Sequence, residues 1–268
     1  MTGRPRLVVT GGSGFLGTHV IPRAEAAGWH VVAPSSGEMD VTDPTGVGRV
    51  LREVLPAAVL HLAYRRDDDA VIVEGSRIVA EAAEQVDARL VHLSTDVVFA
   101  GRAGAYGETD PPDPVHAYGR AKAMAEQAVL RAAPGAVLVR TSLLYGTEHE
   151  GVCQRDVRFA LADPAHMAFF RDEIRNFTHA GDLADACVAL ATRRDVIGPL
   201  HVCGSEPMDR YTFARRFAQS VGADAGVLRA GHIEGSGLAR PARVVLDTGR
   251  AAALGVACRP VSAVLGAA

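Results

Sequence analysis

The chain has 268 residues, a formal net charge of −3 and an apolar content of 48%. This length suits one large α/β domain, or a domain with a small lobe, and it is sufficient for a sizeable core. The lack of a basic excess argues against nucleic acid and anionic membranes as partners, and no apolar run is long enough to cross a bilayer. The cysteines lack metal-ligand spacing, so we expect no metal site and a cytoplasmic protein with reduced thiols.

The N-terminal stretch has the pattern of a dinucleotide-binding βα unit. Residues 7–10 are an apolar run typical of a buried parallel strand, and a G-x-x-G-x-x-G segment then opens a helix. Gly11 permits a tight turn, Gly14 allows the backbone to approach a diphosphate, and Gly17 allows the helix to lie close to the strand. The N–H groups at the helix start favour phosphate binding. The predicted cofactor contacts in this segment are Gly11, Ser13, Gly14, Phe15, Leu16 and Gly17.

The second predicted strand, at residues 29–33, ends without the acidic side chain that would bind a ribose hydroxyl. Pro34-Ser35-Ser36 follows it instead, so a 2′-phosphate is admissible, and Ser35 and Ser36 are candidate donors to it. A plain Pro-Ser turn explains the same residues equally well. Asp40 is a candidate contact for the adenine. We therefore expect NADP(H) as the preferred cofactor and NAD(H) as the alternative.

The third and fourth predicted strands end where a ligand would lie. Residues 57–63 form the third strand, and Leu62 and Ala63 at its end are predicted cofactor contacts. Residues 89–93 form the fourth strand, which leads into Ser94-Thr95-Asp96. Because ligands lie beyond the carboxyl ends of parallel strands, Thr95 is placed to meet a substrate carbonyl. We expect Ser94 to be structural.

Tyr118 and Lys122 stand four residues apart in an alanine-rich stretch that predicts a helix. Side chains at this spacing share one helix face. A neighbouring ammonium favours the phenolate and lowers a tyrosine pKa that is otherwise about 10, which suits Tyr118 for proton transfer near neutral pH. An ordinary solvated helix face is the alternative explanation of the pair.

The alternation of strands and helices up to residue 140 indicates a doubly wound parallel sheet of the Rossmann type. We expect residues 1–146, with about 181–202 returning to the sheet, to form an NAD(P)-binding domain. The composition changes after Gly146. Residues 147–180 and 203–268 are therefore predicted to form a smaller C-terminal α/β lobe that binds the substrate.

Several motifs, in chain order, resemble those of the extended short-chain dehydrogenase/reductase family. They are Thr10 to Gly17, Ser94-Thr95-Asp96, Tyr118-x-x-x-Lys122, Arg175-Asn176-Phe177-Thr178-His179 and Asp182-Leu183-Ala184. Within the family, the S-T-D-x-V-F-x-G segment that ends at Gly101 is similar to that of the dTDP-4-dehydrorhamnose reductases and their sugar-nucleotide-binding relatives. The likeness extends through nearly the whole chain, although residues 147–170 match poorly.

This resemblance implies a catalytic triad of Thr95, Tyr118 and Lys122, of which Tyr118 and Lys122 also contact the cofactor. It implies a small-molecule nucleotide sugar as substrate and a monomeric or homodimeric protein. The implied substrate contacts are Thr95, Asp96, Arg175 and Arg240, with the two arginines at the diphosphate. For Arg175, a surface arginine paired with an acidic neighbour is the alternative. The chain departs from the family at Ile72, where an asparagine usually supports a proton relay.

The implied reaction is the NAD(P)H-dependent reduction of a nucleotide-linked 4-keto-6-deoxy sugar, with the proton supplied by Tyr118. A dehydratase of the family would have Asp-Glu where this chain has Asp96-Val97, which argues against elimination chemistry. Two alternatives stay open. One is an NAD-dependent sugar-nucleotide 4-epimerase, and the other is a non-catalytic NADP-binding regulatory subunit.

Overall fold

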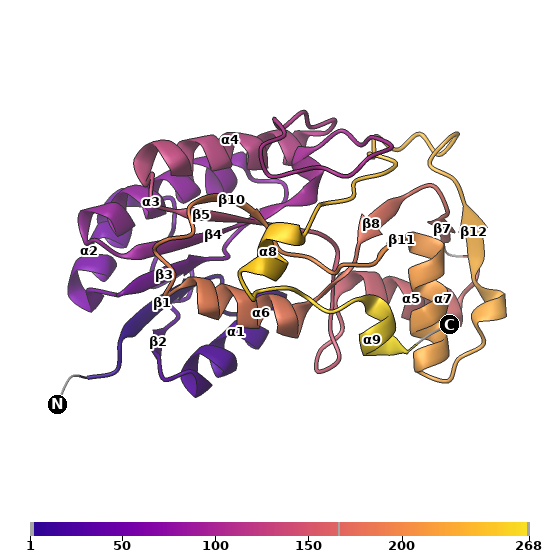
Figure 1. Ribbon diagram of the computed structural model, residues 1–268, viewed down its shortest axis with the longest axis horizontal. Coiled ribbons are helices and arrows are strands. Elements are labelled where there is room, and N and C mark those ends of the chain that lie inside the picture. The colour runs from indigo at the N-terminus through magenta and orange to yellow at the C-terminus, as the bar shows by residue number, and fades with distance from the viewer. Residues whose placement is uncertain (1–2, 166, 267–268) are drawn as a thin grey trace. The chain divides into compact units, whose positions relative to one another are not determined.

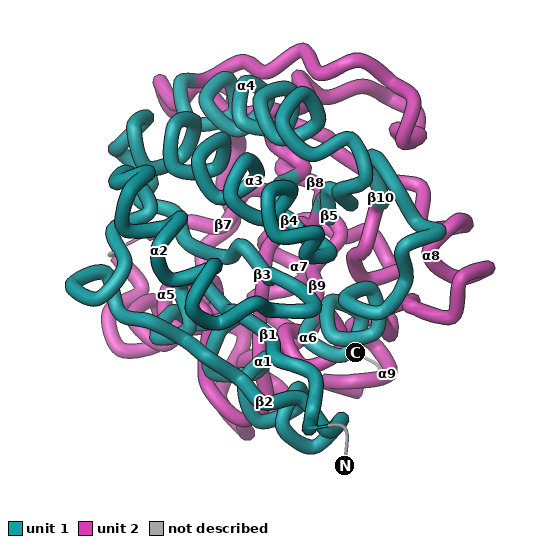
Figure 2. Tube along the Cα trace, turned by 90° about the vertical axis from the view of Figure 1, so that its left-hand side faces the viewer, with its two compact units in different colours: residues 1–95, 117–140, 184–200 teal, residues 96–116, 141–183, 201–268 magenta. Residues whose placement is uncertain are grey.

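The computed structural model describes residues 3–165 and 167–266 (Figure 1). The chain divides into two compact units (Figure 2). Unit 1 comprises residues 1–95, 117–140 and 184–200, and unit 2 comprises residues 96–116, 141–183 and 201–268.

The unit boundaries differ from the expected domain boundaries, which assign residues 96–116 and 141–146 to the first domain. The loop at 96–116 joins unit 2 because its backbone bonds to the C-terminal part of the chain. The Arg102 N–H donates to the Arg243 carbonyl at 3.0 Å, and the Tyr106 N–H donates to the Val245 carbonyl at 2.7 Å. These partners are distant in sequence, so the local pattern of the loop does not indicate them.

A six-stranded sheet forms the centre of unit 1, in the order β10-β5-β4-β3-β1-β2. The strands are β1 (Arg6–Thr10), β2 (His30–Val32), β3 (Ala58–His61), β4 (Arg89–Thr95), β5 (Val137–Thr141) and β10 (Gly198–His201). Strand β1 runs parallel to both β2 and β3, and β3 runs parallel to β4. The predicted doubly wound parallel sheet is confirmed. The strand order reverses beside β1, so the carboxyl ends of β1 and β3 flank the position where ligands of such sheets bind.

Helices cover both faces of this sheet, as Figure 1 shows. One face carries α2 (Pro44–Val54), α3 (Gly75–Gln85) and α4 (Ala117–Ala132), and the other carries α1 (Phe15–Ala26) and α6 (Ala180–Leu190). Asp43 caps α2 by accepting from the Thr45 N–H, and Pro44 occupies the first helical position, where a missing N–H costs nothing. A π-helical turn at Ala70–Glu74 precedes α3. The apolar strand residues Val8, Val59, Leu90 and Leu138 form one core cluster with residues of the covering helices.

Unit 2 consists of short elements around an aromatic core. Its strands are β6 (Leu144–Tyr145), β7 (Ala168–Phe170), β8 (Ile174–Asn176), β9 (Thr178–His179), β11 (Pro207–Asp209) and β12 (Arg229–Gly231). They pair as β11-β8, β12-β7 and β6-β9. Its helices are η2 (Asp96–Val98), α5 (Val152–Ala162), α7 (Arg210–Ser220), η3 (Ala225–Val227), α8 (Gly249–Ala253) and α9 (Val261–Leu265). The rings of Phe177 and Phe213 stack in the core at 4.0 Å.

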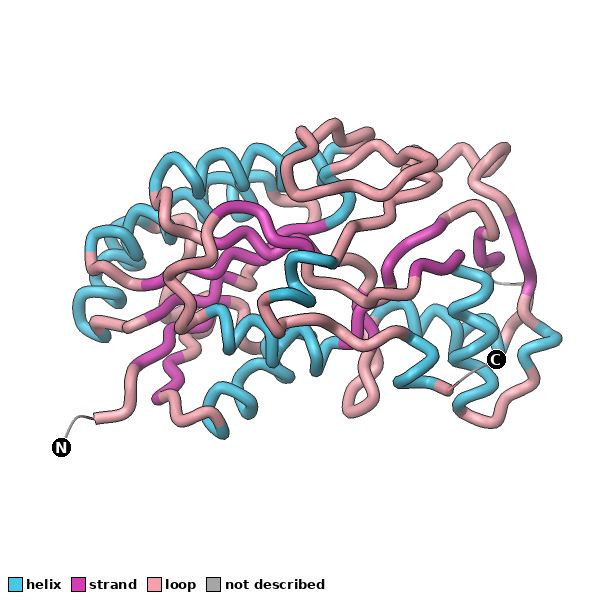
Figure 3. Tube along the Cα trace, viewed as in Figure 1, coloured by secondary structure: helices cyan, strands magenta, loops and turns pink. Residues whose placement is uncertain are grey.

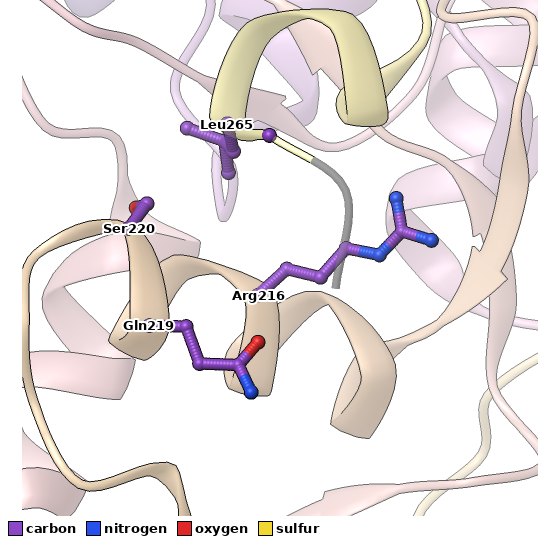
Figure 4. Close-up of a pocket in the computed structure, with 5 residues that line it drawn as sticks. Arg216, Gln219, Ser220 and Leu265 are labelled. Carbon is purple, nitrogen blue, oxygen red and sulfur yellow. The ribbon is translucent and has the colours of Figure 1, made fainter.

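Loops connect the short helices and strands of the second half of the chain (Figure 3). A hollow of about 130 Å³ beside α7 is lined by Arg216, Gln219, Ser220, Leu265 and Gly266 (Figure 4). Arg216, its charged lining residue, already pairs with Glu206 at 2.9 Å, so we assign the hollow no ligand. Over residues 3–165 and 167–266, we find no helix with the length and apolarity of a membrane span.

Candidate active site

The glycine segment after β1 has the geometry of a dinucleotide-binding loop. Gly11 has a φ of +71°, and a Cβ added there would lie 2.8 Å from the Ala63 nitrogen at the end of β3. A Cβ on Gly17 would lie 2.3 Å from the Gly12 carbonyl oxygen. Any larger side chain at these two positions would therefore push the loop away from β3 or α1 away from the loop.

Helix α1 begins at Phe15, directly after Gly14. The first-turn N–H groups of a helix have no intrahelical acceptors, and the helix dipole is positive there. No side chain caps this terminus. The residues present thus fit a diphosphate, which would lie against the backbone of the segment from Gly11 to Gly17.

The segment after β2 shows how the predicted 2′-phosphate contacts are arranged. The Ser35 N–H and hydroxyl both donate to the Glu38 carboxylate, at 2.8 and 2.7 Å. Ser36 is exposed. Asp40 accepts from the Thr42 N–H at 2.9 Å and from its hydroxyl at 2.8 Å, and these two bonds lower the pKa of the Asp40 carboxyl. Of the two serines expected to meet a phosphate, Ser35 is thus already bonded to a carboxylate.

The end of β3 lies beside the glycine loop, and the end of β4 lies beside α4, the helix that carries Tyr118 and Lys122. The Ala63 N–H donates to the Thr10 hydroxyl at 3.2 Å, and the Leu62 N–H donates to the Thr10 carbonyl at 3.2 Å, which ties the end of β3 to β1. Thr95 is the last residue of β4 and is half-buried. It therefore stands at the carboxyl edge of the sheet, where its hydroxyl was predicted to meet a substrate.

Tyr118 lies in the first turn of α4, with its ring near two side chains of the loop after β3. The Tyr64 ring lies 6.1 Å from it, centroid to centroid, and the Arg66 guanidinium carbon lies 5.4 Å from its centroid. On the inner side, Tyr118 packs against the cluster of Ile72, Ala121 and Ala125. Ile72 thus supports the face of α4 that carries Tyr118 through apolar contact, in place of the amide expected from the family pattern.

Lys122 is buried, with 5% of its surface exposed. Its ammonium donates to the Leu93 carbonyl at 2.7 Å and lies 3.4 Å from His92 Nε2. Because Leu93 is two residues before Thr95 on β4, this bond fixes α4 against the strand that carries Thr95. Burial lowers the pKa of Lys122 to about 8.

Lys122 is also the only lysine of the sequence, beside 27 arginines. Arginine cannot replace it, because a guanidinium is larger, planar and always charged. The presence of one lysine among so many arginines indicates that an amine is needed at this position. The Tyr118-Lys122 spacing alone does not show this.

Ser94 and Glu126 belong to a buried polar network behind the site. Ser94 donates its hydroxyl to Glu126 at 2.6 Å, and Arg140 on β5 donates to the same carboxylate at 2.9 and 2.7 Å. This network binds α4 to β4 and β5 one turn beyond Lys122. Ser94 is thus structural, and its partner is a side-chain carboxylate.

In unit 2, Arg175 forms an ion pair with Asp96 and hydrogen bonds to backbone carbonyls. The Arg175 side chain is 2% exposed, and its Nε lies 3.5 Å from the Asp96 carboxylate. The guanidinium also donates to the carbonyls of Ile174, Pro241 and Ala242. A buried guanidinium with these acceptors has little capacity left for a diphosphate. The geometry therefore favours a structural role for Arg175, in contrast to the predicted phosphate contact, and it gives Asp96 the role of counter-ion.

Arg240 remains accessible, with 41% of its side chain exposed, and it pairs with Glu173 at 3.1 Å. Its guanidinium carbon lies 5.9 Å from the Phe170 ring centroid. In the described parts of the chain, no group of three or more histidine, cysteine, aspartate or glutamate side chains is arranged to hold a metal ion.

Comparison with known proteins identifies the family. The family described as "RmlD substrate binding domain" matches residues 5–262. The chain belongs to this family. It is 35% identical to the dTDP-4-dehydrorhamnose reductase of Mycobacterium tuberculosis over an alignment that covers 84% of this chain and 78% of that protein.

Two further proteins are similar to this RmlD-family chain over nearly its whole length. The crystal structure of a dTDP-4-dehydrorhamnose reductase from Bacillus anthracis in complex with NADP has a TM-score of 0.86 at 24% identity, and it covers 96% of this chain and 95% of that chain. Methionine adenosyltransferase 2 subunit beta of Bos taurus is 29% identical over an alignment that covers 95% of this chain and 84% of that protein.

Proposed function

We propose that this chain is an NADP(H)-dependent oxidoreductase that reduces the ketone of a nucleotide-linked 4-keto-6-deoxy sugar, as its dTDP-4-dehydrorhamnose reductase relatives are named to do. The observation that carries the proposal is the arrangement of unit 1. A dinucleotide-type glycine loop, the Thr95 hydroxyl at a strand end, and Tyr118 with Lys122 on one helix all belong to that unit. NAD(H) is the alternative cofactor.

The segment from Gly11 to Gly17 would hold the cofactor diphosphate, and the ends of β2 and β3 would hold the adenosine. When bound, the nicotinamide supplies the hydride, while the protein supplies orientation and electrostatics. Thr95 donates a hydrogen bond to the ketone oxygen as negative charge develops on it. Tyr118 then donates its phenolic proton to that oxygen, which completes the alcohol.

Lys122 contributes a fixed positive charge one helical turn from Tyr118. This charge favours the phenolate that Tyr118 becomes when it gives up its proton. In unit 2, we assign Arg240 to the substrate diphosphate, since its partly exposed guanidinium can form two parallel bonds to phosphate oxygens. Asp96 and Arg175 support that unit from its interior.

We further propose that the protein acts in the cytoplasm as a monomer or homodimer. Its four cysteines are buried and free, which suits a reducing compartment. Light scattering coupled to size-exclusion chromatography would distinguish the two oligomeric states.

The test is an assay of reduced-nicotinamide consumption with an enzymatically prepared dTDP-4-keto-6-deoxy sugar, with NADPH and NADH compared. We expect turnover in the wild type and a loss of about a hundredfold or more in kcat for Tyr118→Phe, as is typical for removal of a general acid. Tyr64→Phe is the matched control, because it removes a phenolic hydroxyl beside Tyr118 but keeps the ring contact. A Tyr118→Phe variant as active as Tyr64→Phe would exclude this mechanism.

A second candidate is a non-catalytic NADP-binding regulatory subunit. Two observations favour it: the similarity to the methionine adenosyltransferase subunit over 95% of the chain, and Ile72 in place of the family's usual asparagine. Tight NADPH binding by titration, together with no turnover of any sugar nucleotide and a stoichiometric protein partner in pull-downs, would establish this function instead.

A further inference from the structure

Lys122 Nζ lies in an interior site formed by β3, β4 and α4 of unit 1. Two acceptors on β4 face its ammonium, namely the Leu93 carbonyl at 2.7 Å and His92 Nε2 at 3.4 Å. His92 is 1% exposed, so solvent does not compete for this contact.

The chemistry of His92 at this position requires a neutral ring. Burial, together with the positive charge of Lys122, lowers the pKa of His92 well below its usual value. A neutral imidazole has one acceptor nitrogen and one N–H. Because Nε2 faces an ammonium, Nε2 is the acceptor and Nδ1 carries the hydrogen.

That Nδ1–H has no hydrogen-bond partner among residues 3–165 and 167–266. A buried donor without an acceptor destabilises the fold, and an apolar side chain of similar volume would avoid this cost. The imidazole is therefore poorly explained as core packing, whereas a specific interaction at Nε2 explains it.

The other groups around the ammonium are fixed by partners of their own. The His61 ring on β3 lies 5.3 Å from the His92 ring, and its Nδ1 bonds the Thr10 hydroxyl at 2.7 Å. Burial lowers the pKa of His61 to about 3, so it too is neutral. On α4, Glu126 raises the pKa of Lys122 through its charge, but its carboxylate is bound to Arg140 and Ser94. Tyr118 stands one turn before Lys122 on the same helix.

We propose that His92 is a positioning residue of the site: its Nε2 accepts from the Lys122 ammonium and, with the Leu93 carbonyl, holds that charge one helical turn from Tyr118. The proposal rests on the reductase function proposed above. The imidazole transfers no proton. It keeps the amine charged and in place, in a site where burial favours the neutral form of the amine.

Because Lys122 is the only lysine, its ionisation can be measured directly. Protein labelled with lysine carrying ¹³C at Cε and ¹⁵N at Nζ gives a single side-chain NMR signal, whose shift reports protonation. We expect a midpoint near 8 in the wild type. His92→Leu, which removes the acceptor, should lower the midpoint by about one to two pH units, since bonds to charged groups are strong. His92→Gln, whose amide oxygen can accept from Nζ, should restore most of the shift.

His61→Leu is the matched control, since it removes an equally buried imidazole that does not bond Nζ, and the Lys122 midpoint should move little. A His92→Leu midpoint equal to that of the wild type would overturn the proposal. The proposal also fails if His61→Leu moves the midpoint as far as His92→Leu does. Should His92→Leu fail to fold, the comparison of His92→Gln with His92→Phe, whose aromatic ring lacks any acceptor, decides the question in the same way.

Activity provides a second readout. We expect His92→Leu to lower kcat by about ten- to a hundredfold through displacement of Lys122, and to shift the alkaline limb of the kcat–pH profile downwards, without lowering the melting temperature. A merely structural histidine would give the opposite pattern, with a lower melting temperature and an unchanged limb. If the wild type turns over no sugar nucleotide, the proposed function fails, while the NMR titration still tests the contact.

Discussion

The Glu126–Arg140 ion pair allows a quantitative prediction for Glu126→Gln. Both side chains are nearly inaccessible, with 4% of Glu126 and 3% of Arg140 exposed. The carboxylate accepts from Arg140 at 2.9 and 2.7 Å and from Ser94 at 2.6 Å. Glutamine keeps the shape but removes the carboxylate charge that faces the buried guanidinium. Breaking a buried pair in this way typically costs about 3–5 kcal/mol in the free energy of unfolding.

Urea denaturation followed by tryptophan fluorescence provides the assay. Trp29 is the single tryptophan of the chain, is 5% exposed and belongs to unit 1, so its emission reports the unit that contains the pair. Glu53→Gln is the control, because the Arg49–Glu53 pair is mostly exposed and should contribute less than about 1 kcal/mol. A loss below about 1 kcal/mol for Glu126→Gln would refute the reasoning from burial. A double replacement of Glu126 and Arg140 by leucine and methionine should regain most of the loss.

Three further outcomes follow from the site. Arg175→Met should lower the free energy of unfolding by about 3 kcal/mol or more, because it leaves the buried Asp96 carboxylate without its cation; a variant that is fully stable but binds nucleotide sugar weakly would instead support a phosphate contact. Arg66→Gln should lower kcat about two- to fivefold, because it removes the cation near the Tyr118 ring. Arg65→Gln, at the exposed neighbouring position, is the control. Equal kinetics in the two variants would show that the Arg66 cation does not assist Tyr118. Burial lowers the pKa of Lys122 from 10.5 to about 8, so between these pH values the unfolded chain binds more protons than the folded chain. The free energy of unfolding of the wild type should therefore rise from pH 8 to 10.5 relative to that of Lys122→Met. Parallel stability–pH curves for the two proteins would show that the amine titrates normally.

The parts of the site that the sequence predicts are those with a local cause. Gly11 has a positive φ and touches β3, so only glycine fits there, and the spacing of the loop glycines already indicates this. Tyr118 and Lys122 share a helix face because helical periodicity places them there, and the parallel sheet follows from the alternation of apolar runs with helices.

The parts that the sequence does not predict depend on partners far along the chain. From its own segment, Arg175 is a cation for a diphosphate or for an acidic neighbour, but its guanidinium bonds carbonyls of Pro241 and Ala242 and faces Asp96. In the sequence, His92 is one more core residue of β4. Its contact with Lys122 is visible only in the fold, where α4 places the ammonium beside His92 Nε2. Ser35 is a different case, because its partner Glu38 is only three residues away, and an acidic residue at that spacing is a local signal that could have indicated the pairing.

The burial of Lys122 has a practical consequence for the chemistry of the surface. Because Lys122 is the single lysine of the sequence and is buried, acylating labels and amine-directed cross-linkers find no lysine target on the surface of the folded chain. Any acylation of Lys122 requires unit 1 to open far enough to release α4 from β4. The rate of that acylation is therefore a measure of local opening around the site, and ligands that close the site should slow it.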